Sequence, residues 1–279
     1  APYSLIRDFN IFYRLKNRQT ILNKFLYTNR TIDRVELDNA FAELAKSKGI
    51  QIKENTTISE HDADKKELKL SNGEILTYEK LIFADGTSGF GSRLQAVHKK
   101  NIAMQLVFPN SAAEEIQIHF GITKRGYGWV SSYGGFTNVG LTDVFDKSVN
   151  YHEVFAGFLK KLGLQADMSA LRGAFTPMEV GEGKACEDIY FVGDAVGACD
   201  PMTLSGLRYG LDSGKLCAEA IAKKDDRLYF ACIRKMKKKF ALMRTLQKIF
   251  YLKACQVCVF DIGCRCFHRM IAYVFNHFF

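Results

Sequence analysis

One segment of the chain passes from an apolar run through a polar turn into a helical pattern. Residues 189–192 are all apolar, as in a buried strand, and Asp194 follows them after a glycine. A loop then ends at Pro201, and a helix is expected over residues 206–221. Such a unit places a carboxylate at a strand end and free backbone N–H groups at a helix start. This arrangement suits the binding of a cofactor, because the acid can hold sugar hydroxyls and the helix start attracts electron-rich atoms.

The rest of the pattern predicts an α/β protein with many short strands. A helix is expected from Asp33 to about Lys48, because apolar residues recur at helical spacing and Gly49 follows. Residues 151–162 also have helical spacing, and residues 116–120 alternate like a half-buried strand. On the first helix, the apolar face is expected to consist of Leu37, Phe41, Leu44 and Ala45. Strands are expected at 126–130 and 138–141, joined by a turn at Gly134-Gly135. A tight hairpin is expected at Asn72-Gly73.

The strand–loop–helix segment resembles the Gly-Asp motif of FAD-dependent oxidoreductases with the p-hydroxybenzoate hydroxylase fold. Within that superfamily it looks most like the geranylgeranyl reductase family. The resemblance implies that Asp194 contacts the ribityl chain of FAD and that Pro201 lies beside the isoalloxazine ring. It also implies that backbone N–H groups of Gly206 and Leu207 meet the pyrimidine edge of the flavin. A helix start at that edge would stabilise the negative charge of the reduced ring.

Two upstream segments are similar to further motifs of the same family. Asp85-Gly86 follows an apolar run and resembles the Asp-Gly motif, although Phe83 replaces its usual first glycine, and Arg93 matches the arginine that follows this motif. Arg34, at the start of the first predicted helix, matches an arginine that reaches the FAD phosphates. By position, Ile58 corresponds to a residue whose backbone lies against the adenosine part of FAD. The resemblance thus implies a cofactor site of Arg34, Ile58, Asp85, Asp194, Pro201, Gly206 and Leu207.

The strongest phosphate-binding element of such proteins is missing from the sequence. The family begins with a strand followed by Gly-x-Gly-x-x-Gly, which binds the FAD pyrophosphate. No such motif follows a strand here, and Gly86, Gly89 and Gly91 have a different spacing. The chain also begins at Ala1, without a methionine. We therefore expect an N-terminally truncated chain in which half of the nucleotide cradle is absent.

Together these features predict an α/β flavoprotein whose FAD-binding, Rossmann-like domain lacks its first βαβ unit. The expected parts are an FAD-binding domain at 1–93 and 185–225, an inserted antiparallel-sheet substrate domain at 94–184, and a basic helical extension at 226–279. The resemblance implies hydride transfer through FAD to a carbon–carbon double bond of an isoprenoid or lipid-like substrate, with NAD(P)H or another reductant as electron donor. No catalytic side chain can be named from the sequence.

Two other functions remain open on the sequence alone. An aromatic hydroxylase, another monooxygenase or a halogenase would use the same flavin face for oxygen chemistry. A non-catalytic remnant of the fold, associated with membranes, would explain the missing glycine-rich motif. Within the expected substrate domain, Tyr127 and Trp129 lie on a strand similar to the family's Gly-Tyr-x-Trp strand, and they either line the substrate pocket or belong to the core.

The positive charge of the chain lies almost entirely at its C-terminal end. Residues 227–279 contain 11 Lys or Arg and one acid, whereas the rest of the chain is nearly neutral. A basic amphipathic helix here could lie on an anionic membrane surface or pack on the protein with its basic face in solvent. The flavoprotein motifs argue against a nucleic-acid partner. The expected apolar face is Met243, Leu246, Phe250 and Val257, opposite Lys237, Arg244 and Lys248.

The eight cysteines bear on location and on metal binding. They occur without a signal peptide, which favours a reducing cytoplasm, with a possible peripheral position on the inner face of the membrane. Four of them are grouped as Cys255-x-x-Cys258 and Cys264-x-Cys266. Four thiols could bind zinc or an iron–sulfur cluster. Because the segment is apolar and compatible with a helix, we expect free cysteines and no metal site.

Overall fold

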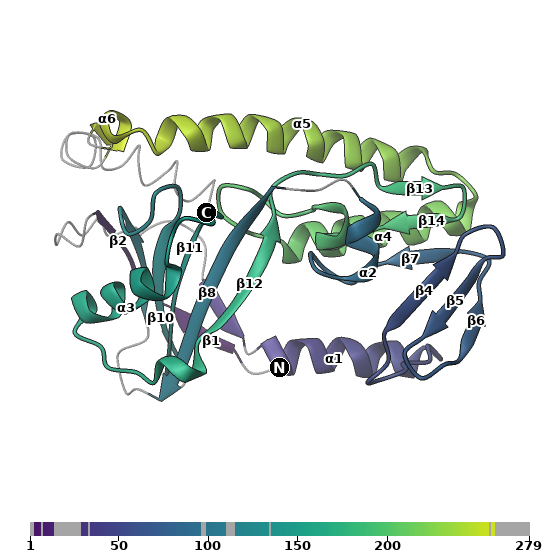
Figure 1. Cartoon of the computed structure of the whole chain (residues 1–279), viewed down its shortest axis with the longest axis horizontal. Coiled ribbons are helices and arrows are strands. Elements are labelled where there is room, and N and C mark those ends of the chain that lie inside the picture. Colours follow the sequence, from purple (N-terminus) through teal and green to yellow (C-terminus); the bar gives the residue numbers. More distant parts are fainter. Residues whose placement is uncertain are drawn as a thin grey trace.

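The computed structural model has a six-stranded sheet at one end, two three-stranded sheets at the other, and a long helix along both (Figure 1). It describes residues 3–6, 8–13, 29–32, 34–95, 99–109, 115–133, 135–256 and 258–259. The large sheet has the order β12-β8-β11-β10-β9-β2, and all neighbours are antiparallel except β2 and β9. Its strands are β2 (Asp8–Tyr13), β8 (Lys100–Pro109), β9 (Glu115–Phe120), β10 (Tyr127–Tyr133), β11 (Phe136–Val144) and β12 (Arg172–Pro177).

One face of the large sheet is closed by α3 (Tyr151–Leu162), whose bounds match the prediction. The side chain of Asn150 accepts a hydrogen bond from the backbone N–H of Glu153, and Gly163 ends the helix at φ +69°. Phe155 and Phe158 pack from α3 against alternate residues of the strands, such as Val139 and Leu141. The residues between these, on the opposite face of the sheet, are therefore free to line a site.

The second core surrounds the three-stranded sheet β13-β14-β7. β14 (Ile189–Phe191) runs parallel to β7 (Leu81–Phe83) and antiparallel to β13 (Lys184–Cys186). All three residues of β14 are buried, as its uninterrupted apolar run predicted. The helix α4 (Leu207–Lys223) and the first turns of α5 (Arg227–Phe250) cover this sheet.

The hairpin predicted at Asn72-Gly73 is confirmed in the sheet β4-β5-β6. Gly73 has φ +85°, and its N–H donates to the carbonyl of Leu70. The strands of this sheet are β4 (Ile58–Asp62), β5 (Glu67–Leu70) and β6 (Ile75–Thr77). The remaining elements are the paired strands β1 (Tyr3–Ile6) and β3 (Asn29–Ile32) and the short helices α2 (Phe90–Leu94), Met168–Ala170, Gly193–Val196 and α6 (Lys253–Gln256).

The first predicted helix is present as α1 (Arg34–Ser47), followed by Gly49 at φ +81°. The described residues do not bury its predicted apolar face, because none of the helix's side chains is buried. Phe41 and Leu44 are 43% and 55% exposed. Helical spacing predicts which side chains share a face, but burial also needs an element that covers the face, and the described residues supply none.

The C-terminal region is helical, as expected, but α5 is rotated relative to the predicted face. Leu246 lies outward and is 38% exposed, whereas Arg244 lies inward and donates from Nη1 to the carbonyl of Met178 at 2.8 Å. The packing partners at both ends of α5 set this rotation. The buried face consists of Tyr229, Ile233, Met236, Phe240, Met243 and Gln247. Val257 lies outside the described residues. No helix among the described residues is long and apolar enough to cross a bilayer.

Candidate functional site

The two motifs found in the sequence meet at one edge of the three-stranded sheet. In the parallel pair β14 and β7, Phe191 lies opposite Phe83, and the N–H of Val192 donates to the carbonyl of Phe83 at 2.9 Å. Because parallel strands end at the same edge, the loops that carry Asp85 and Asp194 are neighbours. Segments far apart in the sequence therefore form the wall of one site.

A cavity of about 490 Å³ opens at this edge, with Asp194 in its wall. We call it the Asp194 cavity; its lining residues are Thr87, Ser88, Ser92, Arg93, Gln95, Lys100, Pro177, Asp194 and Ala195. In the described part of the chain, no group donates a hydrogen bond to the Asp194 carboxylate. Burial raises the pKa of this carboxyl group above its ordinary value, because a charged oxygen loses its water there. An unpartnered, half-buried carboxylate is well placed to accept hydrogen bonds from hydroxyl groups of a ligand.

Thr87 adds a second unpartnered polar group to the same wall. Its side chain is only 9% exposed, and its hydroxyl has no hydrogen-bond partner among the described residues. A buried hydroxyl without a partner costs about 1–3 kcal/mol, so such groups usually meet a ligand or a water. Sequence reasoning missed Thr87, because a threonine after Asp-Gly has no distinguishing pattern.

Asp85 shapes the loop next to this cavity. Its carboxylate accepts a hydrogen bond from the backbone N–H of Gly91 at 2.7 Å, in the first turn of α2. A side chain at Gly89 would overlap this carboxylate, because a Cβ there would lie 2.1 Å from the Asp85 Cγ. Asp85 thus holds the loop that carries Thr87. Its direct contact with a cofactor stays a prediction.

The start of α4 lies beside Asp194, as the motif implied. Gly206 is the residue before the helix, and a Cβ built on it would lie 3.1 Å from Oδ1 of Asp194. Leu207 begins the helix and is 45% exposed. Pro201 is buried in the intervening loop, where its carbonyl accepts a hydrogen bond from Nε2 of Gln247 at 2.8 Å. Three of the predicted residues, Asp194, Gly206 and Leu207, are therefore brought together, with Pro201 in the loop between them.

Two other predicted residues are not joined to this group by any described contact. Arg34 is exposed at the start of α1, and its guanidinium pairs with Asp38 at 3.2 Å. Ile58 begins β4 and packs against the core around Phe83. The structure thus gives Ile58 a packing role, and the contacts of both residues with FAD stay predictions.

Cys199 lies in the same loop but is not an activated thiol. Its Sγ would be 3.8 Å from a Cβ at Gly206, and the side chain is 1% exposed. Burial raises the pKa of this thiol well above its ordinary range, so it is protonated at neutral pH. Among the described residues, no three His, Cys, Asp or Glu side chains converge as a metal site. Cys264 and Cys266 lie outside those residues.

Tyr127 and Trp129 lie on the face of the large sheet opposite α3. The Tyr127 hydroxyl donates to the carbonyl of Thr203 at 2.7 Å, which links this face to the loop before α4. The indole N–H of Trp129 donates to Oδ1 of Asn138 at 3.1 Å. The indole lies over Gly140, where a Cβ would be 2.0 Å from its ring. Tyr127 therefore packs between the large sheet and the loop before α4, with the Trp129 ring beside it.

Comparison with known proteins gives distant relatives only. No protein-family model matches the sequence. An uncharacterized protein of Methanosarcina barkeri is 24% identical over 221 residues, which cover 76% of this chain and 55% of that protein. Menaquinone reductase of Mycolicibacterium smegmatis is 25% identical over 222 residues, which cover 70% of this chain and 54% of the enzyme. The chain thus spans about half the length of the curated relatives it matches.

Comparison with solved structures identifies the fold. A geranylgeranyl bacteriochlorophyll reductase-like protein of Thermoplasma acidophilum has a TM-score of 0.69 at 21% identity, covering 89% of this chain and 72% of that one. A mutant of the flavin-dependent brominase Bmp2 has a TM-score of 0.70 at 15% identity, covering 98% of this chain and 77% of that one. PqsL of Pseudomonas aeruginosa, a probable FAD-dependent monooxygenase, has a TM-score of 0.60 at 13% identity, covering 98% of this chain and 82% of that one. The chain shares its fold with these proteins, which confirms the p-hydroxybenzoate hydroxylase-like fold that the motifs implied.

Proposed function

We propose that this chain is the flavin-holding part of an FAD-dependent oxidoreductase and that the Asp194 cavity receives the ribityl end of the flavin. The observation that carries the proposal is the pair of unpartnered polar groups, the Asp194 carboxylate and the Thr87 hydroxyl, in one cavity at the end of parallel strands. The likeness in fold to FAD-dependent enzymes supports the same assignment.

The residues present fit a sugar-alcohol chain joined to an electron-rich ring. Asp194 would accept hydrogen bonds from ribityl hydroxyls, which would replace the water lost on burial. Gly206 has no side chain, so the ring could approach the start of α4 closely, and the N–H groups there would stabilise negative charge. FAD, when bound, would supply hydride transfer, which no protein side chain can provide. The protein's own contribution is to bind, to orient and to exclude water.

For the reaction, we propose reduction of a carbon–carbon double bond in an isoprenoid or lipid-like substrate. One matched structure is named a geranylgeranyl bacteriochlorophyll reductase-like protein, and one matched relative is named menaquinone reductase. Trp129, half-buried beside Tyr127 on the face of the sheet opposite α3, would contact the apolar chain of such a substrate. NAD(P)H or another reductant would return electrons to the flavin.

The second candidate is a monooxygenase or halogenase. The mutant of the flavin-dependent brominase matches 98% of this chain at a TM-score of 0.70, close to the 0.69 of the reductase-like protein. The likeness in fold therefore does not distinguish a halogenase from a reductase. Oxygen uptake that depends on NAD(P)H and on an aromatic substrate would support the second candidate. Turnover of a polyprenyl substrate in the absence of oxygen would support the reductase.

The Asp194→Asn variant tests the flavin site. Asn keeps the shape of the side chain but removes the charged acceptor, so we expect flavin affinity to fall about tenfold or more, as when a hydrogen bond to a charged group is lost. Titration with FAD, followed by flavin fluorescence, measures the effect. The matched control is Asp212→Asn, an exposed acid on α4. Equal affinities for the two variants would remove Asp194 from the site, and a wild type that binds no FAD would favour the non-catalytic remnant.

We also propose that α5 gives the protein a peripheral contact with anionic membranes. Its outward side combines exposed Leu242, Leu246 and Ile249 with Lys235, and Lys253 follows at the start of α6. Apolar side chains can enter the headgroup region while lysines meet lipid phosphates. An enzyme that reduces a lipid-like substrate would gain access to it in this way.

A further inference from the structure

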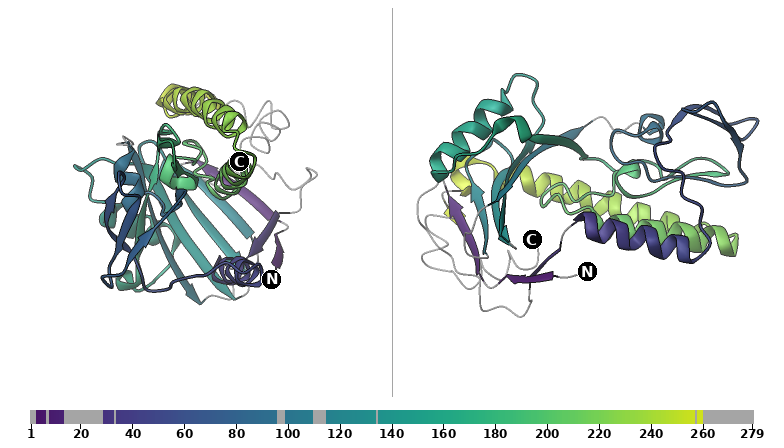
Figure 2. Two further views of the ribbon diagram at one scale, coloured as in Figure 1. Left: turned by 90° about the vertical axis from the view of Figure 1, so that its right-hand side faces the viewer. Right: turned by 90° about the horizontal axis from the view of Figure 1, so that it is seen from below.

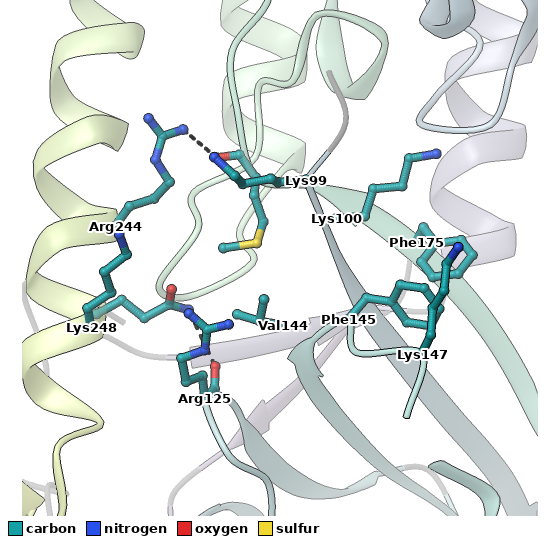
Figure 3. Close-up of a pocket in the computed structure, with 11 residues that line it drawn as sticks. Lys99, Lys100, Arg125, Val144, Phe145, Lys147, Phe175, Arg244 and Lys248 are labelled. Atoms are coloured by element: carbon teal, nitrogen blue, oxygen red, sulfur yellow. Dashed lines mark hydrogen bonds between the residues drawn. The ribbon is translucent and has the colours of Figure 1, made fainter. Parts of the chain in front are cut away.

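A second cavity, of about 590 Å³, lies between the C-terminal half of α5 and the near end of the six-stranded sheet (Figure 3). It is lined from segments that are far apart in the sequence: β8 and the residue before it, β11 and the turn after it, the loop before β10, β12 and α5. We call it the basic pocket; its lining residues are Lys99, Lys100, Arg125, Val144, Phe145, Lys147, Phe175, Met178, Arg244, Gln247 and Lys248.

The charge of the basic pocket is strongly one-sided. Six of its lining residues are Lys or Arg, and none is an acid. Only Lys99 has an ion-pair partner in the described part of the chain, namely Glu179 at 2.8 Å. The other five cations lack a carboxylate partner there. Because several positive charges lie close together here, an anion bound in the pocket would be attracted by all of them.

The acids nearest to Arg125 are engaged elsewhere. The carboxylate of Asp143 accepts hydrogen bonds from the backbone N–H groups of Lys124 and Arg125, at 3.2 and 2.8 Å. Asp146 accepts from the backbone and side chain of Ser148, at 3.0 and 2.7 Å. These carboxylates hold the neighbouring turns and leave the guanidinium of Arg125 without a direct partner.

The α5 wall of the basic pocket is held in place. Nη1 of Arg244 donates to the carbonyl of Met178 at 2.8 Å, which is drawn as a dashed line in Figure 3. Gln247, buried one turn away, donates to the carbonyl of Pro201 at 2.8 Å. These bonds fix the helix against the body of the protein, and Arg244, Lys248 and Arg125 lie on the α5 side of the pocket in Figure 3. A fixed set of donors loses less entropy when it binds an anion than a set of free side chains.

The other side of the basic pocket is aromatic. Phe145 and Phe175 meet edge to face, with ring centroids 4.9 Å apart. Nζ of Lys100 lies 5.7 Å from the Phe175 centroid, and Lys147 lies beside the same rings in Figure 3. The basic pocket thus offers cationic donors at one end and an apolar surface with two lysines at the other.

We propose that the basic pocket binds the phosphate or diphosphate group of an organic ligand whose apolar part covers Phe145 and Phe175. A diphosphate carries several negative charges and many acceptor oxygens, which match five unpaired cations better than one carboxylate would. Arg125 and Arg244 suit phosphate oxygens because a guanidinium can donate two parallel hydrogen bonds. The proposal does not depend on the flavin assignment. Lys100 lines both cavities, so a ligand here would lie next to the Asp194 cavity.

A pair of double variants tests the proposal with inorganic pyrophosphate as the probe. The pocket variant is Lys147→Gln with Lys248→Gln, two exposed side chains whose loss leaves the core intact. The control variant, Lys161→Gln with Lys215→Gln, removes the same charge from exposed positions outside the basic pocket. Calorimetric titration should show pyrophosphate binding that is at least about tenfold weaker in the pocket variant than in the wild type or the control, and weaker for all three in high salt.

A second arm distinguishes a lipid headgroup from a free phosphate ligand. Each protein is sedimented with phosphatidylcholine vesicles that contain or lack phosphatidylglycerol. A loss of sedimentation confined to the pocket variant would identify a lipid headgroup as the source of the phosphate. Unchanged sedimentation with weaker pyrophosphate binding would identify a free, phosphorylated ligand. The proposal is overturned if neither probe distinguishes the pocket variant from the control.

Discussion

Single residues separate into those left open for a ligand and those used for packing. Asp194 and Thr87 line a cavity without partners, whereas His119 is a buried polar residue enclosed by the core. The His119 ring stacks on Phe12 with centroids 4.6 Å apart and meets Phe158 edge to face. Burial lowers the pKa of His119 to about 4, because the imidazolium would lose its water there.

This low pKa predicts a loss of stability in mild acid. The unfolded chain binds a proton at His119 near pH 6.5, and the folded chain does so only near pH 4. Stability from the neutral ring is therefore complete above pH 6.5 and falls as the pH drops toward 4, by up to roughly 3 kcal/mol. Urea unfolding at pH 7 and at pH 4.5 measures the difference in the free energy of unfolding.

His119→Gln is the variant that isolates this effect. Glutamine does not titrate, so the part of the pH dependence that belongs to position 119 should disappear, although the variant itself is less stable at pH 7. A variant with the same loss between pH 7 and pH 4.5 as the wild type would contradict the assignment to His119.

Among the elements, the loop after β14 depends most on backbone conformation. Gly193 and Gly197 have φ of +59° and +82°, in the left-handed region that favours glycine. At Gly197 a Cβ would also lie 1.9 Å from the carbonyl oxygen of Glu179. These two glycines let the chain turn back beneath Asp194 before it reaches α4.

Gly197→Ala should therefore destabilise the protein by about 2 kcal/mol or more, since both strain and overlap oppose the added methyl group. Gly157→Ala is the matched control: it lies within α3, and its Cβ would meet no atom within 4 Å. That change should stabilise the protein by roughly 0.5–1 kcal/mol, because alanine favours a helix. Thermal and urea unfolding compare the two. Equal effects would show that the loop tolerates a side chain at position 197.

For the whole molecule, α5 is the element that connects the two cores. Near its start the hydroxyl of Tyr229 donates to the carbonyl of Gly183 at 2.8 Å, beside the small sheet. Near its end Phe250 meets Phe120 of the large sheet, with centroids 5.4 Å apart. Figure 2 shows the helix running along the outside of both parts, with one side in solvent. That outer side is the surface proposed to contact membranes.

Leu242→Ser with Leu246→Ser tests this surface. Both leucines are exposed, so folding should be unaffected, while binding to vesicles that contain phosphatidylglycerol should weaken about tenfold as apolar area is lost. The control is Ile50→Ser with Ile75→Ser, two exposed apolar residues far from α5 in the sequence. Vesicle co-sedimentation measures the effect. Similar binding by both variants and the wild type would contradict a membrane contact through α5.

Much of the local structure could be predicted, because neighbouring residues decide it. The apolar run of β14, the glycine at the end of α3 and the Asn72-Gly73 hairpin each specify their own conformation. The same holds for Asp194 and Gly206, whose proximity follows from a short loop between a strand and a helix. Residue spacing was a poorer guide to burial, as the exposed Phe41 of α1 illustrates.

Taken alone, the amino-acid sequence determined the main helices and several of the strands, the position of Asp194 at a strand end, and the concentration of positive charge near the C-terminus. The tertiary structure decided which face of α5 is buried, that Thr87 shares a cavity with Asp194, and that Lys100, Arg125 and Lys248 gather in one pocket. The physical reason is the distance along the sequence over which each kind of interaction acts. Turns, caps and periodicity act between residues a few positions apart, whereas these sites form only when the packing of two cores brings distant segments together.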